Sequence, residues 1–429
     1  MSNNARVVAG GEIGVAQYLQ ALACRAEPDV RMNPVLIKPE GDTHSQVVIN
    51  GVVDLGLSRL PWRDRSPFFV EAVDHALRSL LAEFDLVLIE GAGSPAEINL
   101  RRNDIANMRP ASIAHAPVLL VSDIDRGGSF AHLYGTWALL AADERSRIAA
   151  FVLNKFRGDE RLLAPAPQRL QELTGVPLLG IVPWIEHALP DEDGAAELRQ
   201  RGNRPLIGII RYPTASNLDE FRVLEEVADV LWARSPQQLR DADLVVLPGS
   251  KHVAADLDWL ITRDFAAALR RRAAAGAPII GICGGLQMLG REIVDKGDVD
   301  GTRIGLGLLA VSTSFASEKV TRRTATRFAE ELPEPWKKLA GLSFQGYEIR
   351  HGASELVGDA GQALPAGLGF VSGSVLGLYV HGLFEQPQLT RALLGAAATT
   401  TPDETFECLA DVIDSVFDSQ LTDRLVGLG

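Results

Sequence analysis

The feature that most constrains the fold is a cysteine placed between a buried strand and a helix. The short apolar run Ala277–Ile282 (APIIGI) is followed directly by Cys283, Gly284 and Gly285. Small neighbours permit a strained turn that lifts the sulfur out of a sheet, and the N-terminus of the following helix favours a thiolate. The pattern predicts a parallel α/β sheet with Cys283 as a nucleophile, although an isolated cysteine is more often a buried structural residue.

A nucleophile of this kind needs a base and an oxyanion site. His381 follows the apolar run LYV and precedes a glycine, so it is the candidate base. Gly249 and Ser250 follow the apolar run Leu244–Leu247, and their N–H groups, with that of Gly284, are candidates for the oxyanion site. Taken singly, each has an ordinary alternative: a surface histidine, and a Pro-Gly turn.

These three motifs, in this order, resemble the class I glutamine amidotransferases from about Pro205 to the C-terminus. The resemblance implies that Cys283 attacks the side-chain amide of glutamine and that His381 transfers protons. In that family a glutamate usually stands two residues after the histidine, but here that residue is Leu383, and Glu385 is offset. We therefore predict a Cys–His dyad and leave the third member open.

Polar side chains end successive predicted strands in the first half of the chain. Glu90 ends Asp85–Glu90, Asp123 and Asp125 follow Pro117–Ser122, and Asn154 ends Ile148–Asn154. Ligands bind at the carboxyl ends of parallel strands, and carboxylates hold Mg²⁺ on phosphates. We predict a Mg-ATP site at this edge, with Glu90 as a magnesium ligand; solvent-facing turns at the strand ends are the alternative.

Several strings of the first half, together with the Cys–His pattern, resemble the cobyric acid synthase family along nearly the whole chain; they are MNPVLIKP, DTHSQV, EGAGSPAEINL, DIDRGG and NKFRGD. The resemblance implies that glutamine and ATP are used to amidate four peripheral carboxylates (b, d, e and g) of a corrinoid, adenosylcobyrinic acid a,c-diamide, in cobalamin biosynthesis. Lys38 is a candidate contact for a substrate carboxylate or an acyl phosphate, with a solvated lysine as the alternative, and Asp42 is a further candidate substrate contact.

The predicted fold is α/β with two domains. Residues 1–203 are expected to form a P-loop-synthetase-like (dethiobiotin-synthetase-like) parallel sheet that lacks its first strand and loop. Residues 204–429 are expected to form a flavodoxin-like class I glutamine amidotransferase domain. The charged segment Asp191–Arg204 is the predicted linker. Helices are predicted near residues 70–83, 130–142, 253–274, 288–294 and 404–421, a further strand at 176–182, and antiparallel strands between 301 and 379.

The family's phosphate-binding loop, G-x-x-x-x-G-K-[ST], does not occur in this sequence. Either the start is assigned too late or the chain is a shortened form, and we expect weak binding of Mg-ATP by the chain as given. The alternative function is a truncated non-ligase that retains glutaminase activity or binds a corrinoid or a partner. A ligase for another substrate, such as a cell-wall precursor, is a third possibility.

The composition of the chain limits the classes of binding partner that we expect. There are 42 Lys and Arg against 55 Asp and Glu, a net charge of −13, which disfavours binding to nucleic acid or to an anionic membrane. Three cysteines provide no disulfide framework, and no apolar run is long enough to span a membrane. Composition therefore favours a cytoplasmic protein, and the resemblance implies glutamine and a corrinoid as its partners.

Overall fold

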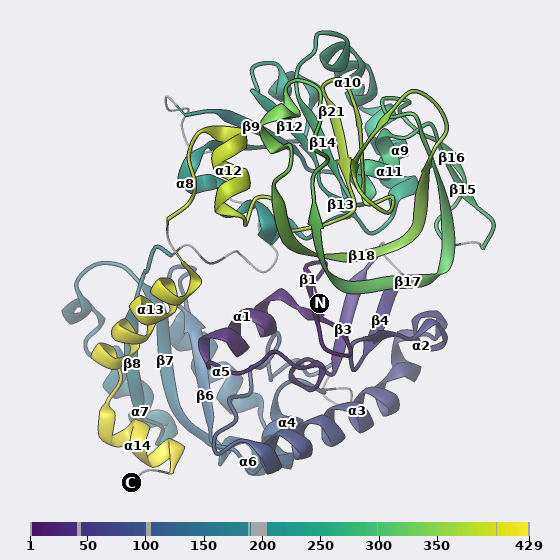
Figure 1. Ribbon diagram of the computed structural model, residues 1–429. Coiled ribbons are helices and arrows are strands. Elements are labelled where there is room, and N and C mark those ends of the chain that lie inside the picture. The colour runs from purple at the N-terminus through teal and green to yellow at the C-terminus, as the bar shows by residue number, and fades with distance from the viewer. Residues whose placement is uncertain are drawn as a thin grey trace. The chain divides into compact units, whose positions relative to one another are not determined.

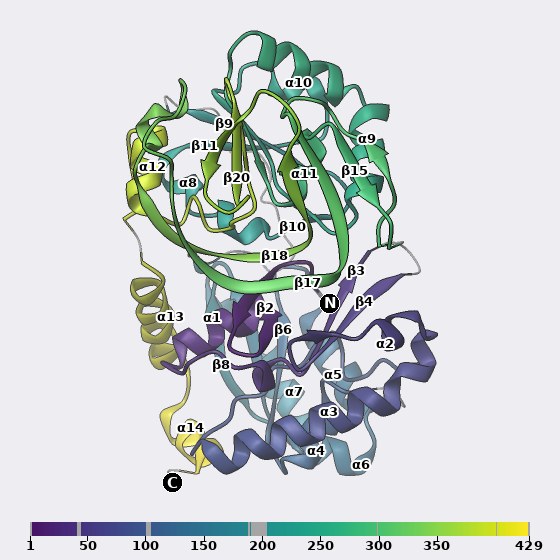
Figure 2. The same ribbon diagram turned by 45° about the vertical axis from the view of Figure 1, so that its right-hand side comes forward.

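The computed structural model describes residues 2–40, 44–99, 104–187, 189, 204–297, 299–399 and 401–427. Its contacts divide the chain into two compact units (Figures 1 and 2). Unit 1 contains residues 1–58 and 189–399, and unit 2 contains residues 59–188 and 400–429. The first 58 residues thus pack with the second half of the chain, and the C-terminal residues pack with the first half. The sequence division at 203/204 stays a prediction, and nearly all of the predicted linker lies outside the described residues.

Unit 1 is built on a seven-stranded sheet with the order β11-β9-β12-β14-β21-β20-β19. Its first five members are parallel, and β20 and β19 are antiparallel additions at one edge. Apolar residues run continuously along the parallel strands because helices cover both faces of such a sheet. The strands are β9 (Leu206–Ile210), β11 (Asp229–Ala233), β12 (Leu244–Leu247), β14 (Ile279–Ile282), β19 (Gly361–Leu364), β20 (Gly369–Ser372) and β21 (Val375–Leu378). The helices are α8 (Leu224–Val227), α9 (Val253–Thr262), α10 (Phe265–Ala274), α11 (Gly284–Leu289) and α12 (Pro387–Leu394).

Two predicted helices of unit 1 are wrong in extent. The helix predicted at 253–274 is two helices, because Asp264 adopts a left-handed φ of 63° between α9 and α10. The helix predicted to extend over 288–294 ends earlier, because α11 stops at Leu289. The N–H of Arg291 donates to the carbonyl of Val311 at 2.8 Å, and the chain continues as strand β15 (Glu292–Asp295).

The predicted antiparallel region is confirmed. It forms the sheet β16-β15-β17-β18, in which the long strands β17 (Val311–Arg327) and β18 (Ser343–Leu356) pair antiparallel and β16 is Arg303–Ile304. Short elements complete unit 1: β10 (Ala215–Ser216) pairs with β13 (Gly249–Ser250), and the single turns are η4 (Leu218–Phe221), η5 (Pro236–Leu239) and η6 (Trp336–Leu339).

The N-terminal segment of unit 1 packs against β18. Ala5, Val7, Leu36 and Val48 form a small core with Tyr347 and Ile349 of that strand, and Figure 2 shows β1 and β2 beside β17 and β18. The segment contains β1 (Ala5–Val8), β2 (Gly11–Gly14), α1 (Val15–Ala23), η1 (Val30–Met32), β3 (Val35–Pro39), β4 (Ser45–Ile49), β5 (Val52–Val53) and α2 (Leu55–Arg59).

Unit 2 is built on the parallel sheet β6-β7-β8, whose strands confirm three predictions. They are β6 (Val118–Asp123), β7 (Ile148–Phe156) and β8 (Leu178–Pro183), with helices α3 (Trp62–Glu83), α4 (Met108–Ile113), α5 (Ser129–Leu139), α6 (Ala142–Arg145), α7 (Ala166–Thr174) and the turn η3 (Glu160–Leu163). The predicted closing helix is two helices, α13 (Pro402–Val416) and α14 (Ser419–Val426), because Asp418 caps a new helix. Their apolar side chains, including Ile413 and Val416, pack against buried residues of β7 and β8 (Figure 1).

The strand predicted at Asp85–Glu90 is wrong. These residues form an irregular segment with no ladder partner among the described residues. The side chains of Leu86 and Leu88 are 54% and 74% exposed. An apolar sequence of residues with high β-propensity forms a buried strand only where a neighbouring strand pairs with it. No described helix of either unit is long and apolar enough to cross a membrane.

Candidate active site

Cys283 occupies the strained turn predicted between β14 and α11. Its φ of 52° and ψ of −108° lie outside the regions that a non-glycine residue ordinarily adopts. Its N–H donates to the carbonyl of Leu378 at 2.7 Å, which ties the turn to β21. A Cβ on Gly285 would lie 2.1 Å from the carbonyl oxygen of Leu247, so only glycine fits there. The backbone of three neighbouring strands therefore holds the sulfur at their carboxyl edge.

The other site residues follow neighbouring strands at this edge. Gly249 and Ser250 follow β12, and His381 follows β21, the two strands that flank β14. Glu220 lies in the turn η4, ten residues after β9. All four strands are parallel, so the residues after their carboxyl ends gather on one side of the sheet.

His381 is held by Glu220, which the sequence did not single out. The distance from His381 Nδ1 to Glu220 Oε1 is 2.8 Å, and the N–H of Gly382 donates to Glu220 Oε2, also at 2.8 Å. Both side chains are buried, with exposures of 1% and 0%. A carboxylate is only an acceptor, so Nδ1 carries the proton and Nε2 is left for Cys283.

The charge of His381 depends on these two neighbours. Burial alone would lower the pKa of His381, but the Glu220 carboxylate and the hydrogen bond to Cys283 raise it to about 10. At neutral pH the imidazole is therefore cationic beside the sulfur, which is the state that stabilises a cysteine thiolate.

Neither Leu383 nor Glu385, which closely follow His381 in the sequence, takes the place of Glu220. Leu383, at the position where class I enzymes usually have glutamate, is 0% exposed and belongs to the main apolar core. Glu385 pairs with Arg6. The third member that the sequence left open is thus supplied in this geometry from a turn 161 residues upstream.

The predicted oxyanion residues lie next to the cysteine and the histidine. A Cβ on Gly284 would lie 2.8 Å from the backbone nitrogen of Ser250, and a Cβ on Gly249 would lie 3.2 Å from Cε1 of His381. Ser250 Oγ donates to Asp256 at 2.6 Å, which fixes the turn from the side of α9. The structure thus brings Gly249, Ser250 and Gly284 together, and their role in binding an oxyanion stays a prediction.

In unit 2 the predicted nucleotide residues are brought together in part. Asp123 and Asn154 are register partners at the carboxyl ends of β6 and β7. Asp123 Oδ2 lies 3.2 Å from Lys155 Nζ, and Asp125 lies 3.5 Å from Arg157 Nε. Glu90 is the last residue of the irregular segment 85–90 and does not belong to a strand of this sheet.

The described residues do not fit a protein-held magnesium ion. They contain no cluster of three or more His, Cys, Asp or Glu side chains able to hold a metal. Asp123 and Asp125 face cationic side chains instead. The assignment of Glu90 as a magnesium ligand stays a prediction.

Lys38, the predicted substrate lysine, is fully buried in unit 1. Its Nζ lies 2.7 Å from Glu12 Oε2, and Lys319 Nζ donates to Glu12 Oε1 at 2.6 Å. Burial alone would raise the pKa of Glu12, but Lys319, Lys38 and Lys251 lower it well below its ordinary value. Lys38 therefore has a structural partner, and its contact with substrate stays a prediction. Asp42 lies outside the described residues.

Replacing Glu12 with glutamine is expected to destabilise unit 1 by about 3–5 kcal/mol, the cost of leaving buried charges without their counter-ion. Because its folded-state pKa is depressed, Glu12 contributes stability above its unfolded pKa of about 4.3, and the contribution is lost as the pH falls below about 4. Urea unfolding at pH 7 and at pH 3 measures both effects.

Glu27→Gln is the matched control, since Glu27 is 79% exposed and pairs at 3.4 Å with an exposed arginine. It should unfold like the wild type. If Glu12→Gln also unfolded like the wild type at pH 7, the Glu12 cluster would not be a stabilising element.

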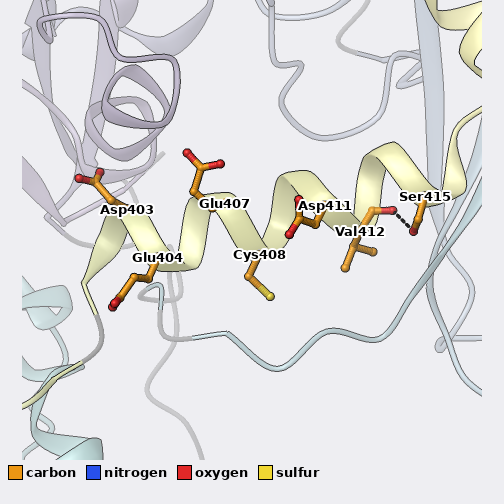
Figure 3. Close-up of a pocket in the computed structure, with 7 residues that line it drawn as sticks. All are labelled: Asp403, Glu404, Glu407, Cys408, Asp411, Val412 and Ser415. Atoms are coloured by element: carbon orange, nitrogen blue, oxygen red, sulfur yellow. Dashed lines mark hydrogen bonds between the residues drawn. The ribbon is translucent and has the colours of Figure 1, made fainter.

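The described surface of unit 2 also has a hollow of about 610 Å³, and none of its lining residues is a predicted site residue. Figure 3 shows that every labelled residue of this hollow comes from α13. Four of them are acidic, and one is the exposed Cys408. One face of one helix provides no convergent chemistry, so the hollow adds nothing to the site.

Comparison with known proteins agrees with this geometry. Residues 206–389 match the family described as "CobB/CobQ-like glutamine amidotransferase domain", and residues 65–192 match an "AAA domain", which is consistent with ATP use. A solved "glutamine amidotransferase" aligns over 43% of this chain and 95% of its own, with 20% identity and a TM-score of 0.34.

Full-length relatives give the clearer result. The "Cobyric acid synthase" of Polaromonas sp. strain JS666 is 51% identical over 99% of this chain and 90% of its own length. Those of Variovorax paradoxus and Acidovorax ebreus are 51% and 53% identical, each over 99% of this chain and 91% of the relative. This chain is therefore an amidotransferase that belongs to the cobyric acid synthase family.

Proposed function

We propose that this chain hydrolyses glutamine and uses the ammonia to amidate peripheral carboxylates b, d, e and g of adenosylcobyrinic acid a,c-diamide, with ATP as the second substrate. The observation that carries the glutaminase half is the buried His381–Glu220 pair beside Cys283 at the carboxyl edge of the sheet. The corrinoid half rests on the relatives that share about half of the sequence along its whole length.

In the proposed mechanism, the Cys283 thiolate attacks the side-chain amide carbon of glutamine. The N–H groups of Gly284 and of the Gly249–Ser250 turn stabilise the resulting oxyanion. The His381 imidazolium gives its Nε2 proton to the leaving nitrogen, so ammonia departs and a thioester forms. His381 then takes a proton from water, which attacks the thioester and releases glutamate. Glu220 accepts the Nδ1 hydrogen bond throughout, so it fixes the orientation of the ring and stabilises the imidazolium whenever the ring is protonated.

For the amidation half, we propose that ATP converts a corrinoid carboxylate to an acyl phosphate, which ammonia then attacks. Asp123, Asp125 and Asn154 are the candidate nucleotide residues, because they meet at the carboxyl ends of β6 and β7. Glu90 as a ligand of Mg²⁺ on ATP, and Lys38 and Asp42 as substrate contacts, belong to the same proposal.

One observation favours the alternative of a chain that keeps glutaminase activity without ligase turnover. Glu90 and the apolar residues before it are not part of the parallel sheet, so the predicted nucleotide edge is incomplete in the described residues. The two candidates share the Cys283 chemistry and differ only in whether corrinoid amides form.

The discriminating experiment supplies the purified chain with glutamine, Mg-ATP and adenosylcobyrinic acid a,c-diamide. Glutamate release and corrinoid mass are followed together. The ligase proposal expects glutamate and a product lighter by about 1 Da for each carboxylate converted to an amide. Glutamate without a corrinoid mass change would support the alternative, and the absence of both would contradict the proposed glutaminase.

A further inference from the structure

The turn that carries Glu220 is bound by the first residues of the chain. Asn4 Oδ1 accepts a hydrogen bond from the N–H of Leu218 at 3.0 Å. Asn217 Nδ2 donates to the carbonyl of Ala5 at 3.0 Å and to Tyr347 Oη at 2.9 Å. Asn217 has a left-handed φ of 56°, so the turn is sharply shaped at the point where β1 contacts it. Residues 4 and 5 therefore define the backbone path that leads to Glu220.

Arg6 adds a charged bridge at the same place. Its Nη1 donates to Glu385 Oε2 at 3.0 Å, and its Nη2 pairs with the carboxylates of both Asp219 and Glu385. Asp219 directly precedes Glu220, and Glu385 lies four residues after His381. One guanidinium thus connects the segments that carry the two members of the His381–Glu220 pair.

The bridge is shielded from solvent and lies against an aromatic ring that contacts the histidine. The Arg6 side chain is 13% exposed, and that of Asp219 is 0% exposed. The Arg6 guanidinium lies 5.0 Å from the ring centre of Tyr347, and the Tyr347 and His381 rings stack with their centres 5.1 Å apart. Tyr347 also accepts from Asn217, so Arg6, Tyr347 and the η4 turn support one another.

Arg6 is the counter-ion of two carboxylates, those of Asp219 and Glu385. The Glu220 carboxylate pairs with His381, whereas those of Asp219 and Glu385 pair with Arg6. Burial raises the pKa of Asp219, against the opposing effect of Arg6. Without Arg6, a buried carboxylate next to Glu220 would have no counter-ion, and the turn would have to shift to reach water.

We propose that Arg6 is a positioning residue that holds Glu220 against His381, so that glutamine hydrolysis depends on the N-terminal segment. The proposal rests on the proposed glutaminase activity. It requires no contact between Arg6 and glutamine. Its effect is therefore expected on the rate of the chemical step and not on the binding of glutamine.

Arg6→Gln is expected to lower kcat for glutamine hydrolysis by about 10- to 100-fold, the usual effect of a misplacement of about 1 Å, while KM stays within about twofold. Rates are expressed per folded chain, from circular dichroism. The double variant Arg6→Gln/Asp219→Asn should recover part of kcat, because the unpaired buried charge is removed and two amides replace the ion pair. Arg31→Gln is the control: Arg31 pairs at 2.9 Å with Asp29 inside the N-terminal segment and should behave like the wild type.

A wild-type kcat in Arg6→Gln would overturn the inference, as would an equal loss of kcat in the single and double variants. If Arg6→Gln does not fold, Arg6→Lys carries the test. A lysine keeps the charge but lacks the planar fork that bridges two carboxylates, so kcat should fall by about three- to tenfold, and an unchanged kcat contradicts the proposal. Absence of glutamate release by the wild type would instead refute the proposed function, which separates the two failures.

Discussion

Cys283→Ala is expected to reduce glutamate release from glutamine by about a millionfold, in practice to below detection, because the nucleophile is the one group that no neighbour replaces. The other groups assigned to the reaction are unsuited to attack, because they are backbone N–H groups and an imidazole held by a carboxylate. Any amidation supported by high concentrations of an ammonium salt should persist, since ammonia then bypasses the glutaminase step. Glutamate and amide formation are measured in parallel with each nitrogen source.

The chain offers a matched control for this change. Cys408 is a second free cysteine, but it is exposed on α13 and does not belong to the sheet edge. Cys408→Ala should retain full glutaminase activity. Substantial glutamate release by Cys283→Ala would remove Cys283 from the mechanism, and equal losses in both variants would point to damage of the fold.

The part of the site that depends on local sequence was predictable. A strained turn at Cys283 needs small neighbours within two residues, and Gly284 and Gly285 are visible in the sequence for that reason. The turns after β12 and β21 are also local features, because each has a glycine within four residues of the strand end: Gly249 after β12 and Gly382 after β21. Local backbone requirements leave a trace at fixed spacing, and such traces identify Cys283, His381 and the Gly249–Ser250 turn.

Glu220 was not predictable by the same means. Its contact with His381 spans 161 residues, so no spacing rule connects them. The chain has 55 acidic residues, and only the folded structure shows which of them contacts His381. The one local signal is an Asn-Leu-Asp-Glu run shortly after a strand, which alone is typical of a solvated turn. The family pattern directed attention to the residues after His381, where Leu383 is in fact needed by the core.

The error at residues 85–90 has a different cause. The run DLVLIE has the composition of a buried parallel strand, and the sequence contains no sign against it. Whether such a run becomes a strand depends on a neighbour that can pair with it, which is a property of the tertiary structure. In the described structure the sheet of unit 2 has only β6, β7 and β8, and this run remains irregular. The predicted strands that became β6, β7 and β8 each have such a neighbour in this sheet and were predicted correctly.

Glu220→Gln is expected to lower kcat for glutamine hydrolysis by about two to four orders of magnitude with little change in KM. Glutamine has nearly the same size and can still accept one hydrogen bond, but it is neutral and can also present its NH₂ group to the ring. The imidazolium then loses the carboxylate that stabilises it, and the ring can adopt the wrong tautomer. Initial rates over a range of glutamine concentrations separate kcat from KM.

The pH profile provides a second, independent measure. In the wild type, Glu220 and Cys283 raise the pKa of His381 to about 10, so the imidazolium persists through neutral and mildly alkaline pH. Removing the carboxylate lowers that pKa, because burial opposes the charged ring. The alkaline limb of kcat should therefore move to lower pH in Glu220→Gln, a shift that a simple loss of folded protein would not cause.

The Glu385→Gln variant tests whether Glu220 or Glu385 is the third member of the triad. Glu385 is closer to His381 in sequence but pairs with Arg6, and its side chain is 28% exposed. Arg6 keeps Asp219 as a partner when Glu385 is neutral, so the variant should retain kcat within a few-fold and keep the wild-type alkaline limb. If Glu385→Gln lost two orders of magnitude and Glu220→Gln did not, the third member of the triad would be the residue near His381 in sequence and the buried pair would be structural. The opposite result, with the shifted limb confined to Glu220→Gln, assigns the charge of His381 to a turn that lies 161 residues upstream in the sequence.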